Sequence, residues 1–332
     1  MKVKKLPGIC FFGCGNIAIR HTRILKKLYP DIEISFASRS NIKSKEYTDK
    51  FDGKYSFSNY EDAAESDLFD IAFITTPHAF HSDLAVLAAK NKKNLIIEKP
   101  VTRNLSELLR LENAVNQNKV RCTIAENYYY KSFIQKIRGF IEKNYIGKIL
   151  FIELNKTNKD TISGWRTDSE MMGGGALLEG GIHWVNALIS LSGANPIEVI
   201  AFKPDVHYET NIPFEDSLTV CINFDNGAVG KLLHSWRIPN PLKGVGLSKI
   251  YGSDGIITFE SNGLFVYISG KKKKFIFTNP TDFLGYKAMH RAFINAYISN
   301  EPWQPSLERI RLEMKLVTSA YKSLSSKKLE QI

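Results

Sequence analysis

Short apolar runs alternate with amphipathic stretches through the first 125 residues of the chain. Because the runs are apolar on both faces, they predict buried parallel strands, and the stretches between them have helical spacing. The predicted strands span residues 9–12, 32–37, 70–74, 95–97 and 120–125, and the predicted helices span 16–28, 78–90 and 104–118. This alternation predicts an α/β fold with a doubly wound parallel sheet.

The pattern changes after about Glu126, where longer strands follow one another with few helices between them. An Asn226–Gly227 pair between two apolar runs predicts a hairpin turn. The predicted strands span 148–155, a stretch beginning near His207, 217–224, 228–236, 249–252, 256–259, 264–268 and 274–278, and the helices 132–144, 286–299 and 307–324. We therefore expect a domain over 1–125 and an α+β domain over 126–332 with a large, mainly antiparallel open sheet.

The sequence GCGNIA, residues 13–18, follows the first strand and opens the first helix. Gly13 permits a tight turn, Gly15 lets the backbone approach a pyrophosphate, and Ala18 lets helix and strand pack closely. The helix N-terminus at Asn16 and Ile17 offers amide donors and a positive dipole end to phosphates. In this strand–turn–helix context the motif predicts dinucleotide binding.

The second strand ends in Ser38–Arg39, where an NAD site usually has Asp or Glu to bind the ribose 2′-hydroxyl group. An arginine at this place suits a 2′-phosphate, so the sequence favours NADP(H) over NAD(H). The alternative is that Arg39 only stacks on the adenine or faces solvent.

The run Leu95–Pro100 joins an apolar strand to Glu98, Lys99 and Pro100. Ligands gather at the carboxyl ends of strands in such sheets, and the pKa of a lysine shifts readily, so Lys99 is a candidate catalytic acid. The alternative is a surface Glu–Lys pair.

Thr75–Thr76–Pro77 ends the preceding strand, and His81 follows one helical turn later, where it either faces the nicotinamide or serves as a surface or capping residue.

A glycine-rich run, residues 173–181, leads into a predicted helix that carries Glu179 and His183 at i, i+4 on one face. Gly180 and Gly181 inside that helix cost about 1 kcal/mol each relative to alanine, which suggests close approach of another backbone or a ligand. A carboxylate–imidazole pair suits general acid–base catalysis. The alternatives are a structural Glu–His pair and a metal site, for which the spacing places no third ligand.

Composition and charge narrow the function further. The chain of 332 residues is 43% hydrophobic and 24% charged, which is ordinary for a globular protein. No apolar run reaches the roughly 20 residues of a membrane span, and the basic N-terminus runs straight into the glycine turn, so we expect neither a membrane segment nor a signal peptide. Four cysteines without paired metal spacing favour a reduced, cytoplasmic protein.

The formal net charge of +11 has two interpretations, solvated lysine faces or attraction of an anionic substrate such as a nucleotide-linked sugar. The basic residues are dispersed, and we expect no nucleic-acid partner.

Together these motifs resemble the glucose–fructose oxidoreductase / inositol dehydrogenase / MocA family over nearly the whole chain. The resemblance is carried by the glycine turn at 13–18, Thr76–Pro77, Glu98–Lys99–Pro100, Trp165–Arg166 and the glycine-rich run ending at His183. It implies an NAD(P)-binding Rossmann domain over 1–125 and a substrate-binding domain over 126–332, whose last helix is expected to pack back on the first. The outer face of the second sheet is expected to build homodimers or homotetramers.

The resemblance also implies that Lys99 lies beside nicotinamide and substrate, with a cis peptide before Pro100, and that His183 is the catalytic histidine. Two positions depart from the family pattern. Glu179 stands where Asp is usual, and Asn186 where a further Asp often follows. Glutamate keeps the charge on a longer arm, so we expect the chemistry to be retained and the substrate geometry to differ.

We therefore expect an NAD(P)-dependent oxidoreductase that acts on a secondary alcohol or ketone of a sugar or sugar derivative, without a metal. The expected catalytic residues are Lys99, Glu179 and His183, and the substrate-binding residues are these three and Arg166. The expected cofactor-binding residues are Gly13, Gly15, Asn16, Ile17, Ser38, Arg39, Thr75, Thr76, Pro77, His81, Glu98, Lys99, Trp165 and Arg166. The alternatives are a nucleotide-sugar 3-dehydrogenase or 3-ketoreductase, an NAD-dependent glycoside hydrolase and a non-catalytic dinucleotide sensor.

Overall fold

The chain folds into two compact units. The computed structural model describes residues 5–206, 213–240, 245–278 and 280–332. The first unit combines Met1–Glu126 with Tyr286–Ile310, and the second combines Asn127–Gly285 with Arg311–Ile332. Helix α10 (Tyr286–Ser299), which lies near the C-terminus in sequence, therefore belongs to the same unit as the N-terminal sheet.

The described part of the first unit contains a six-stranded sheet. Its strands are β1 (Ile9–Phe12), β2 (Ile34–Ala37), β3 (Ser56–Phe57), β4 (Ile71–Ile74), β5 (Asn94–Ile97) and β6 (Cys122–Ile124). They are arranged in the order β3–β2–β1–β4–β5–β6, and every neighbouring pair is parallel, which confirms the predicted doubly wound sheet. All residues of β1, β2 and β4 are buried, which explains their continuous apolar runs. The order reverses between β1 and β4, where ligands bind in such sheets.

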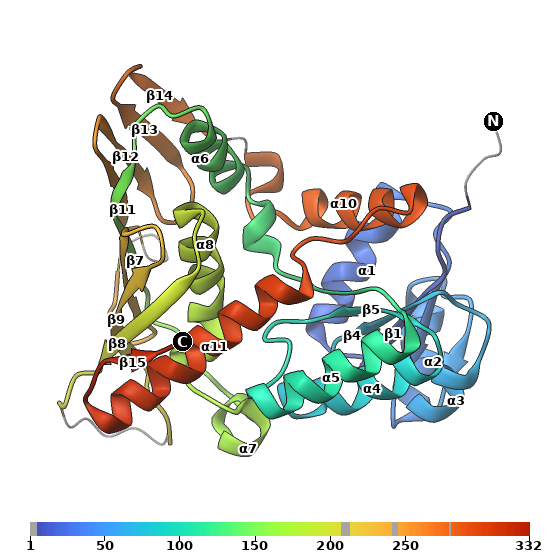
Figure 1. Cartoon of the computed structure of the whole chain (residues 1–332). Helices are drawn as coiled ribbons and strands as arrows, with labels where there is room; N and C mark the ends of the chain where they lie inside the picture. Colours follow the sequence, from blue (N-terminus) through green and yellow to red (C-terminus); the bar gives the residue numbers. More distant parts are fainter. Residues whose placement is uncertain (1–4, 207–212, 241–244, 279) are drawn as a thin grey trace. The chain divides into compact units, whose positions relative to one another are not determined.

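Helices pack in pairs around this sheet (Figure 1). Helix α1 (Asn16–Leu28) lies beside α10 (Tyr286–Ser299), and α4 (His81–Lys90) lies beside α5 (Leu105–Asn118). Helix α4 follows a separate 3₁₀ turn, η1 (His78–Phe80), where the pattern predicted one helix from residue 78. Helices α2 (Asn41–Lys50) and α3 (Tyr60–Glu65) were not predicted. Helix α2 buries only Ser44 and Tyr47, so it lacks an apolar stripe.

The described part of the second unit contains a nine-stranded sheet. Its strands are β7 (Ile149–Thr157), β8 (Pro196–Phe202), β9 (Ser217–Phe224), β10 (Val229–Ser235), β11 (Leu247–Gly252), β12 (Gly255–Glu260), β13 (Phe265–Ser269), β14 (Lys274–Phe277) and β15 (Glu330–Gln331). The order is β14–β13–β12–β11–β7–β10–β9–β8–β15. Only β7 and β10 pair in parallel, so the predicted mainly antiparallel sheet is confirmed.

Two details of that sheet bear on the sequence predictions. The hairpin predicted at Asn226–Gly227 joins β9 to β10. The strand predicted from near His207 lies outside the described residues, and β8, which lies before it, was not predicted.

Two helices of the second unit pack on its sheet: α6 (Ser132–Glu142) lies against β13, and α8 (Ile182–Ser192) lies against β7 and β10 (Figure 1). The helical segments are η2 (Asn127–Tyr130), α6 (Ser132–Glu142), η3 (Gly164–Thr167), α7 (Ser169–Met172), η4 (Leu177–Gly181), α8 (Ile182–Ser192), η5 (Pro280–Asp282) and α11 (Leu307–Ser326). Among the residues described, no helix is long and apolar enough to cross a membrane.

Candidate active site

The glycine turn forms a cradle at the N-terminus of α1. Gly13 has a φ of +115°, and a Cβ there would lie 3.0 Å from the Thr75 carbonyl group, so a side chain does not fit. A Cβ on Gly15 would meet nothing within 4 Å, which leaves open space beside the helix start. Helix α1 has no side-chain cap and no acidic residue in its first turn, so its amides remain available to an anion. This geometry fits a dinucleotide pyrophosphate.

The end of β4 closes the other side of this turn. The Thr75 hydroxyl donates a hydrogen bond of 2.8 Å to the Gly13 carbonyl oxygen. The Thr76 hydroxyl is buried and has no hydrogen-bond partner within the described residues. A buried hydroxyl without a partner is costly unless a ligand satisfies it, which supports a polar ligand here.

Ser38 and Arg39 lie where the end of β2 meets α2. The Ser38 Oγ accepts a hydrogen bond of 3.2 Å from the Ser40 amide. The Arg39 guanidinium lies 4.9 Å from the centroid of the Phe80 ring, so it stacks on a protein ring. No carboxylate occupies position 38.

Glu98 is buried at the end of β5, with 6% of its surface exposed. Its Oε1 lies 2.7 Å from His21 Nε2, and its Oε2 accepts a hydrogen bond of 3.0 Å from the Lys99 amide. Burial raises the pKa of Glu98, but the His21 hydrogen bond and the Lys99 charge outweigh it, so the pKa is lowered. The Lys99–Pro100 peptide is cis, as the resemblance implied.

His81 is fully buried behind the same strand end. Its Nδ1 lies 2.8 Å from the Pro100 carbonyl oxygen and its Nε2 lies 2.9 Å from that of Thr76. Burial lowers the pKa of His81, against the effect of these two carbonyl groups. The structure therefore places the imidazole between two carbonyl oxygens, and the neutral ring donates its single N–H to one of them.

In the second unit, Arg166 pairs with the candidate carboxylate. Its guanidinium lies 3.2 Å from Glu179 and 3.3 Å from Asp160, and 5.7 Å from the centroid of the Trp236 ring. Trp165, its neighbour on η3, is 36% exposed. Two carboxylates therefore more than neutralise the single positive charge of Arg166.

The predicted regular helix through Glu179 and His183 is wrong in its first part. Residues Leu177–Gly181 form a π-helical turn, η4, and α8 begins at Ile182. The π turn is wider than an α-turn, but residues four apart still lie near one face, so the shared face of Glu179 and His183 stays a prediction. The role of Glu179 in orienting His183 stays a prediction.

The glycines around this turn make room for distant side chains. A Cβ at Gly180 would lie 3.0 Å from Trp236 Nε1 and 3.1 Å from His234 Nε2. The sequence led us to expect another backbone or a ligand at this point, but an indole and an imidazole occupy it. Farther back, a Cβ at Gly175 would overlap the carboxylate of Glu215.

Glu215 and Tyr321 cap the start of the η4 turn. Glu215 Oε1 accepts hydrogen bonds from the Leu177 amide at 2.9 Å and the Tyr321 hydroxyl at 3.0 Å. The Tyr321 hydroxyl in turn accepts from the amides of Gly175 and Leu178. The Glu215 residue is partly exposed, but its carboxyl group is buried. This burial raises the pKa of the carboxyl group to about 7.

Sequence reasoning missed the aromatic neighbour of His183. The Tyr128 ring on η2 stacks on the His183 imidazole, with centroids 4.2 Å apart and an interplanar angle of 9°. Lys131, which is 2% exposed, places its Nζ 3.4 Å from the Tyr128 ring centroid. The run Tyr128–Tyr130 directly after β6 was the available signal.

His234 lies on β10 beneath the same turn. It is buried, and neither ring nitrogen has a hydrogen-bond partner within the described residues. Burial lowers its pKa to about 4, although Glu179 opposes that effect. His234 is therefore neutral near pH 7.

Asn186, one turn beyond His183, is fully buried and donates a hydrogen bond to Glu313 on α11. Within the described ranges, no group of three or more His, Cys, Asp or Glu residues could hold a metal ion.

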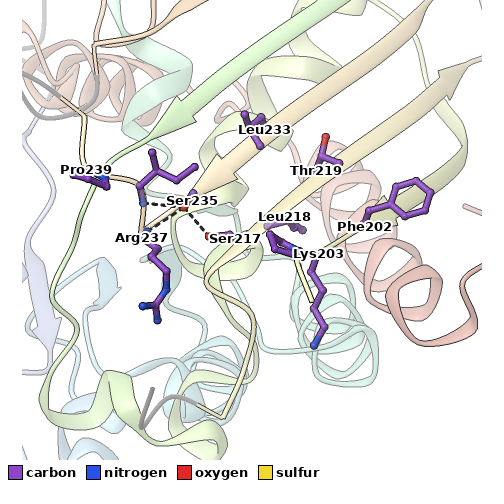
Figure 2. A pocket seen from close by; sticks show the side chains of 11 residues that line it. Phe202, Lys203, Ser217, Leu218, Thr219, Leu233, Ser235, Arg237 and Pro239 are labelled. Carbon is purple, nitrogen blue, oxygen red and sulfur yellow. Dashed lines mark hydrogen bonds between the residues drawn. The ribbon is translucent and has the colours of Figure 1, made fainter. Parts of the chain in front are cut away.

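A pocket of about 500 Å³ lies across β8, β9 and β10, lined by residues such as Phe202, Thr219 and Leu233 (Figure 2). Side chains alternate along a strand, so Leu233 and His234 point to opposite faces of the sheet. Because His234 contacts the η4 turn, the pocket lies across the sheet from that turn, and it is not the candidate catalytic site.

A glycine cradle at the switch point of a parallel sheet, followed by a unit with a large open sheet, defines a Rossmann-type dinucleotide-binding protein with a second α+β unit. Residues 8–126 match the model of the oxidoreductase family with an NAD-binding Rossmann fold, and residues 134–258 match the GFO/IDH/MocA C-terminal domain. The chain therefore belongs to the GFO/IDH/MocA family of NAD(P)-binding oxidoreductases.

Several relatives carry names. D-xylose 1-dehydrogenase [NADP(+)] of Haloarcula marismortui is 28% identical over 165 residues, 48% of this chain and 46% of that protein, so the match spans about half of each. Trans-1,2-dihydrobenzene-1,2-diol dehydrogenase of Xenopus tropicalis is 24% identical over 85% of this chain and 87% of that protein. A structure of levoglucosan dehydrogenase in complex with NADH has a TM-score of 0.87 at 18% identity, covers 98% of both chains and shows the shared fold.

Proposed function

We propose that this protein transfers hydride between a nicotinamide and a secondary alcohol or ketone of a sugar or sugar derivative. The observation that carries the proposal is the open cradle at Gly15 beside the buried Thr76 hydroxyl, at the strand ends where Lys99 also lies. The names of the relatives, D-xylose 1-dehydrogenase and levoglucosan dehydrogenase, support a sugar.

The cofactor, when bound, would supply hydride transfer at its nicotinamide ring. The amides of Asn16 and Ile17 would hold its pyrophosphate, and Thr76 and Pro77 would line the path towards the ring. In the oxidative direction His183 would accept the hydroxyl proton of the substrate. Lys99 would stabilise the negative charge that develops on the substrate oxygen. In this proposal Glu179, which pairs with Arg166, positions the His183 imidazole for proton transfer.

Cofactor choice rests on Arg39. A guanidinium that lies over the Phe80 ring keeps its N–H donors available at its edge, where they suit a 2′-phosphate. Ser38 adds a small polar group in place of the acid of an NAD site. NADP(H) is therefore the favoured cofactor, and NAD(H) is the alternative.

The neutralised charge of Arg166 favours a neutral sugar over a nucleotide-linked one. Asp160 and Glu179 both pair with this guanidinium, so it has little net charge left for a phosphate. A nucleotide-sugar substrate would need another cationic side chain to bind its phosphates. Because salt screens that attraction, this alternative predicts that KM rises steeply with salt concentration. A neutral sugar predicts a KM that is nearly independent of salt.

The first experiment is a fluorescence titration of the purified protein with NADPH and NADH, after a check for cofactor that co-purifies. Turnover is then screened with D-xylose, D-glucose and levoglucosan. We expect tight, reversible NADPH binding and reduction of NADP⁺ by at least one sugar. Arg39→Ala should weaken NADPH about 10- to 100-fold and NADH much less, as expected for loss of a charge-assisted pair. Equal losses would contradict the 2′-phosphate argument.

The remaining alternatives give different results. A cofactor that never leaves, with glycoside cleavage and no net reduction, would identify a hydrolase. Binding without turnover of any sugar, unchanged in Lys99→Met and His183→Ala, would identify a sensor. No binding of either nucleotide would overturn the proposal.

The second unit is proposed to bind the substrate and to form a homodimer or homotetramer through the open face of its sheet. In the described residues that face exposes Phe151, Phe275 and Phe277, which are 52%, 55% and 75% exposed. Exposed apolar side chains on one face are typical of an interface. Light scattering of the purified protein tests this, and a monomer at micromolar concentration would contradict it.

The four cysteines are free, which agrees with the proposed cytoplasmic location.

A further inference from the structure

Three side chains from distant parts of the first unit form a buried chain of hydrogen bonds. His290 Nε2 on α10 lies 2.9 Å from His21 Nδ1 on α1, and His21 Nε2 lies 2.7 Å from Glu98 Oε1 after β5. His290, His21 and Glu98 are 1%, 0% and 6% exposed. Phe73 and Tyr286 enclose the His21 ring, with ring centroids 4.6 and 5.3 Å away. Water therefore does not reach this chain from the sides that these rings cover.

Each buried nitrogen at the contacts has a partner in one consistent arrangement of protons. The Glu98 carboxylate only accepts, so His21 Nε2 carries a proton and donates it. Burial holds the pKa of His290 well below its usual range, so that ring is neutral. One further proton then lies between His290 Nε2 and His21 Nδ1: a neutral His21 accepts it from His290, and a doubly protonated His21 donates it to His290. Both cases leave Glu98 fixed by His21.

This chain ends on the backbone of Lys99. Glu98 uses its second oxygen, Oε2, to accept the hydrogen bond from the Lys99 amide. On the other side, His81 Nδ1 lies 2.8 Å from the Pro100 carbonyl oxygen and Nε2 lies 2.9 Å from that of Thr76. Both oxygens only accept, so the neutral ring donates one hydrogen bond, and we assign it to Pro100. The segment that carries the Lys99 amine is thus held at its amide by one imidazole–carboxylate pair and at the next carbonyl by another imidazole.

A polar arrangement of this kind is an expensive way to fill a core. Apolar residues of similar volume often replace a buried ion pair without loss of stability. A fully satisfied buried network does fix one orientation of the groups it contacts. The free-energy cost of burying these polar groups has an explanation if the orientation of the Lys99 segment is needed for catalysis.

We propose that His21, supported by His290, and His81 are positioning residues that hold the Lys99–Pro100 segment so that the Lys99 amine is presented in one orientation. The inference rests on the proposed function, in which Lys99 acts on the substrate oxygen. The histidines act through the backbone of Lys99 and need not touch cofactor or substrate. None of them was singled out for this role by its place in the sequence.

The test compares His21→Leu, His21→Gln and His81→Gln with a matched control, Thr22→Val. Thr22 is the next residue on α1, is also fully buried, and has no hydrogen-bond partner for its hydroxyl within the described residues. Replacement by valine therefore changes the same helix without touching the chain. His21→Gln keeps a side-chain N–H for Glu98, so it serves as the conservative variant.

All three histidine variants keep the glycine turn, so the His21 variants should bind NADPH with nearly unchanged Kd, whereas His81→Gln also alters the contact to the Thr76 carbonyl and should bind it several-fold more weakly. Their kcat should fall about 10- to 100-fold with little change in KM, as expected for a misplaced catalytic group. Activity should decrease in the order wild type, His21→Gln, His21→Leu, and the pH profile of kcat should shift. Thr22→Val should match wild type. If the single variants His21→Gln and His81→Gln both fold and both keep the wild-type kcat and pH profile, the inference is overturned.

A second measurement does not depend on a substrate. Competitive acetylation with acetic anhydride, followed by mass spectrometry of the Lys99 peptide, reports the reactivity of that amine as a function of pH. The histidine variants should change this reactivity several-fold relative to surface lysines, and Thr22→Val should not. Unchanged reactivity would overturn the inference even if no sugar is turned over. If Lys99→Met keeps full kcat, the proposed role of Lys99 fails instead.

Discussion

The ring of Tyr128 lies parallel to the imidazole of His183, with centroids 4.2 Å apart. The buried ammonium of Lys131 lies 3.4 Å from the centroid of the same tyrosine ring. Trp184 adds an edge contact to Tyr128 at 5.8 Å. The proposed catalytic base is thus oriented by a ring that is itself held in place by two neighbours, so the orientation of His183 depends on η2 as well as on its own helix.

Removing the Tyr128 ring should therefore lower kcat. An aromatic pair contributes about 0.5–1.5 kcal/mol beyond its buried area, so Tyr128→Leu should reduce kcat about 2- to 10-fold through a less ordered His183. Tyr128→Phe keeps the ring and should retain most of the activity. Steady-state kinetics with the sugar that is turned over measure both. Tyr129→Leu is the control, because the Tyr129 ring contacts Tyr130. An equal loss in Tyr129→Leu would contradict this explanation.

Two helical glycines should respond to alanine in opposite ways. A Cβ on Gly180 in η4 would be tight, because His234 and Trp236 lie 3.0–3.1 Å from that position and both are held in a buried cluster. Gly180→Ala should therefore destabilise the protein by about 1–3 kcal/mol through overpacking. Gly139 on α6 has nothing within 4 Å, and Gly139→Ala should stabilise by about 0.5–1 kcal/mol. Urea unfolding of both variants measures the difference, and a stabilised Gly180→Ala would contradict the described packing.

Most strands of the first sheet could be predicted from the sequence because they are buried on both faces. Residues 9–12 read as one apolar run, and all four are buried in β1. The polar helix α2 could not be predicted in this way, because its contribution to the core is limited to Ser44 and Tyr47. Propensity and periodicity therefore identified the elements that fill the core and missed those that cover it.

The candidate site was predictable in its local motifs but not in its long-range contacts. The glycine turn and the Lys99 strand end depend on neighbours in sequence, and the structure forms the turn after β1 and ends β5 just before Glu98. The π turn at Glu179 depends on Glu215 and Tyr321, which are distant in the chain. The same holds for His21 with Glu98, since no local pattern pairs residues on α1 and after β5.

His234 should make the protein less stable in acid. Burial lowers its folded pKa to about 4 from an ordinary value of 6.5. Between these values the unfolded chain binds a proton that the folded chain does not, so stability is lost as the pH falls from 6.5 towards 4. His234→Leu removes the titration and two unpartnered nitrogens. Its Tm should equal or exceed that of wild type at pH 7, with a gap that widens at pH 5. Parallel Tm curves would show that His234 is not a buried neutral base.

Glu215 should give the opposite pH dependence. Burial raises its folded pKa to about 7 from an ordinary value of 4.5, so between these values the folded chain holds a proton that the unfolded chain has lost. The stability from this group is complete below about pH 4.5 and is lost as the pH rises through 7. Glu215→Gln keeps the acceptor for the Leu177 amide without a charge. Wild type should therefore lose Tm relative to Glu215→Gln between pH 5 and pH 8.

Tyr321→Phe separates the titration of Glu215 from the loss of the cap. This change leaves the amides of Gly175 and Leu178 without their acceptor and should cost about 1–3 kcal/mol. Glu215 remains, so the loss persists on both sides of pH 7. If Glu215→Gln follows wild type across the whole range, the carboxyl group titrates in its ordinary range and the start of the π turn is open to water.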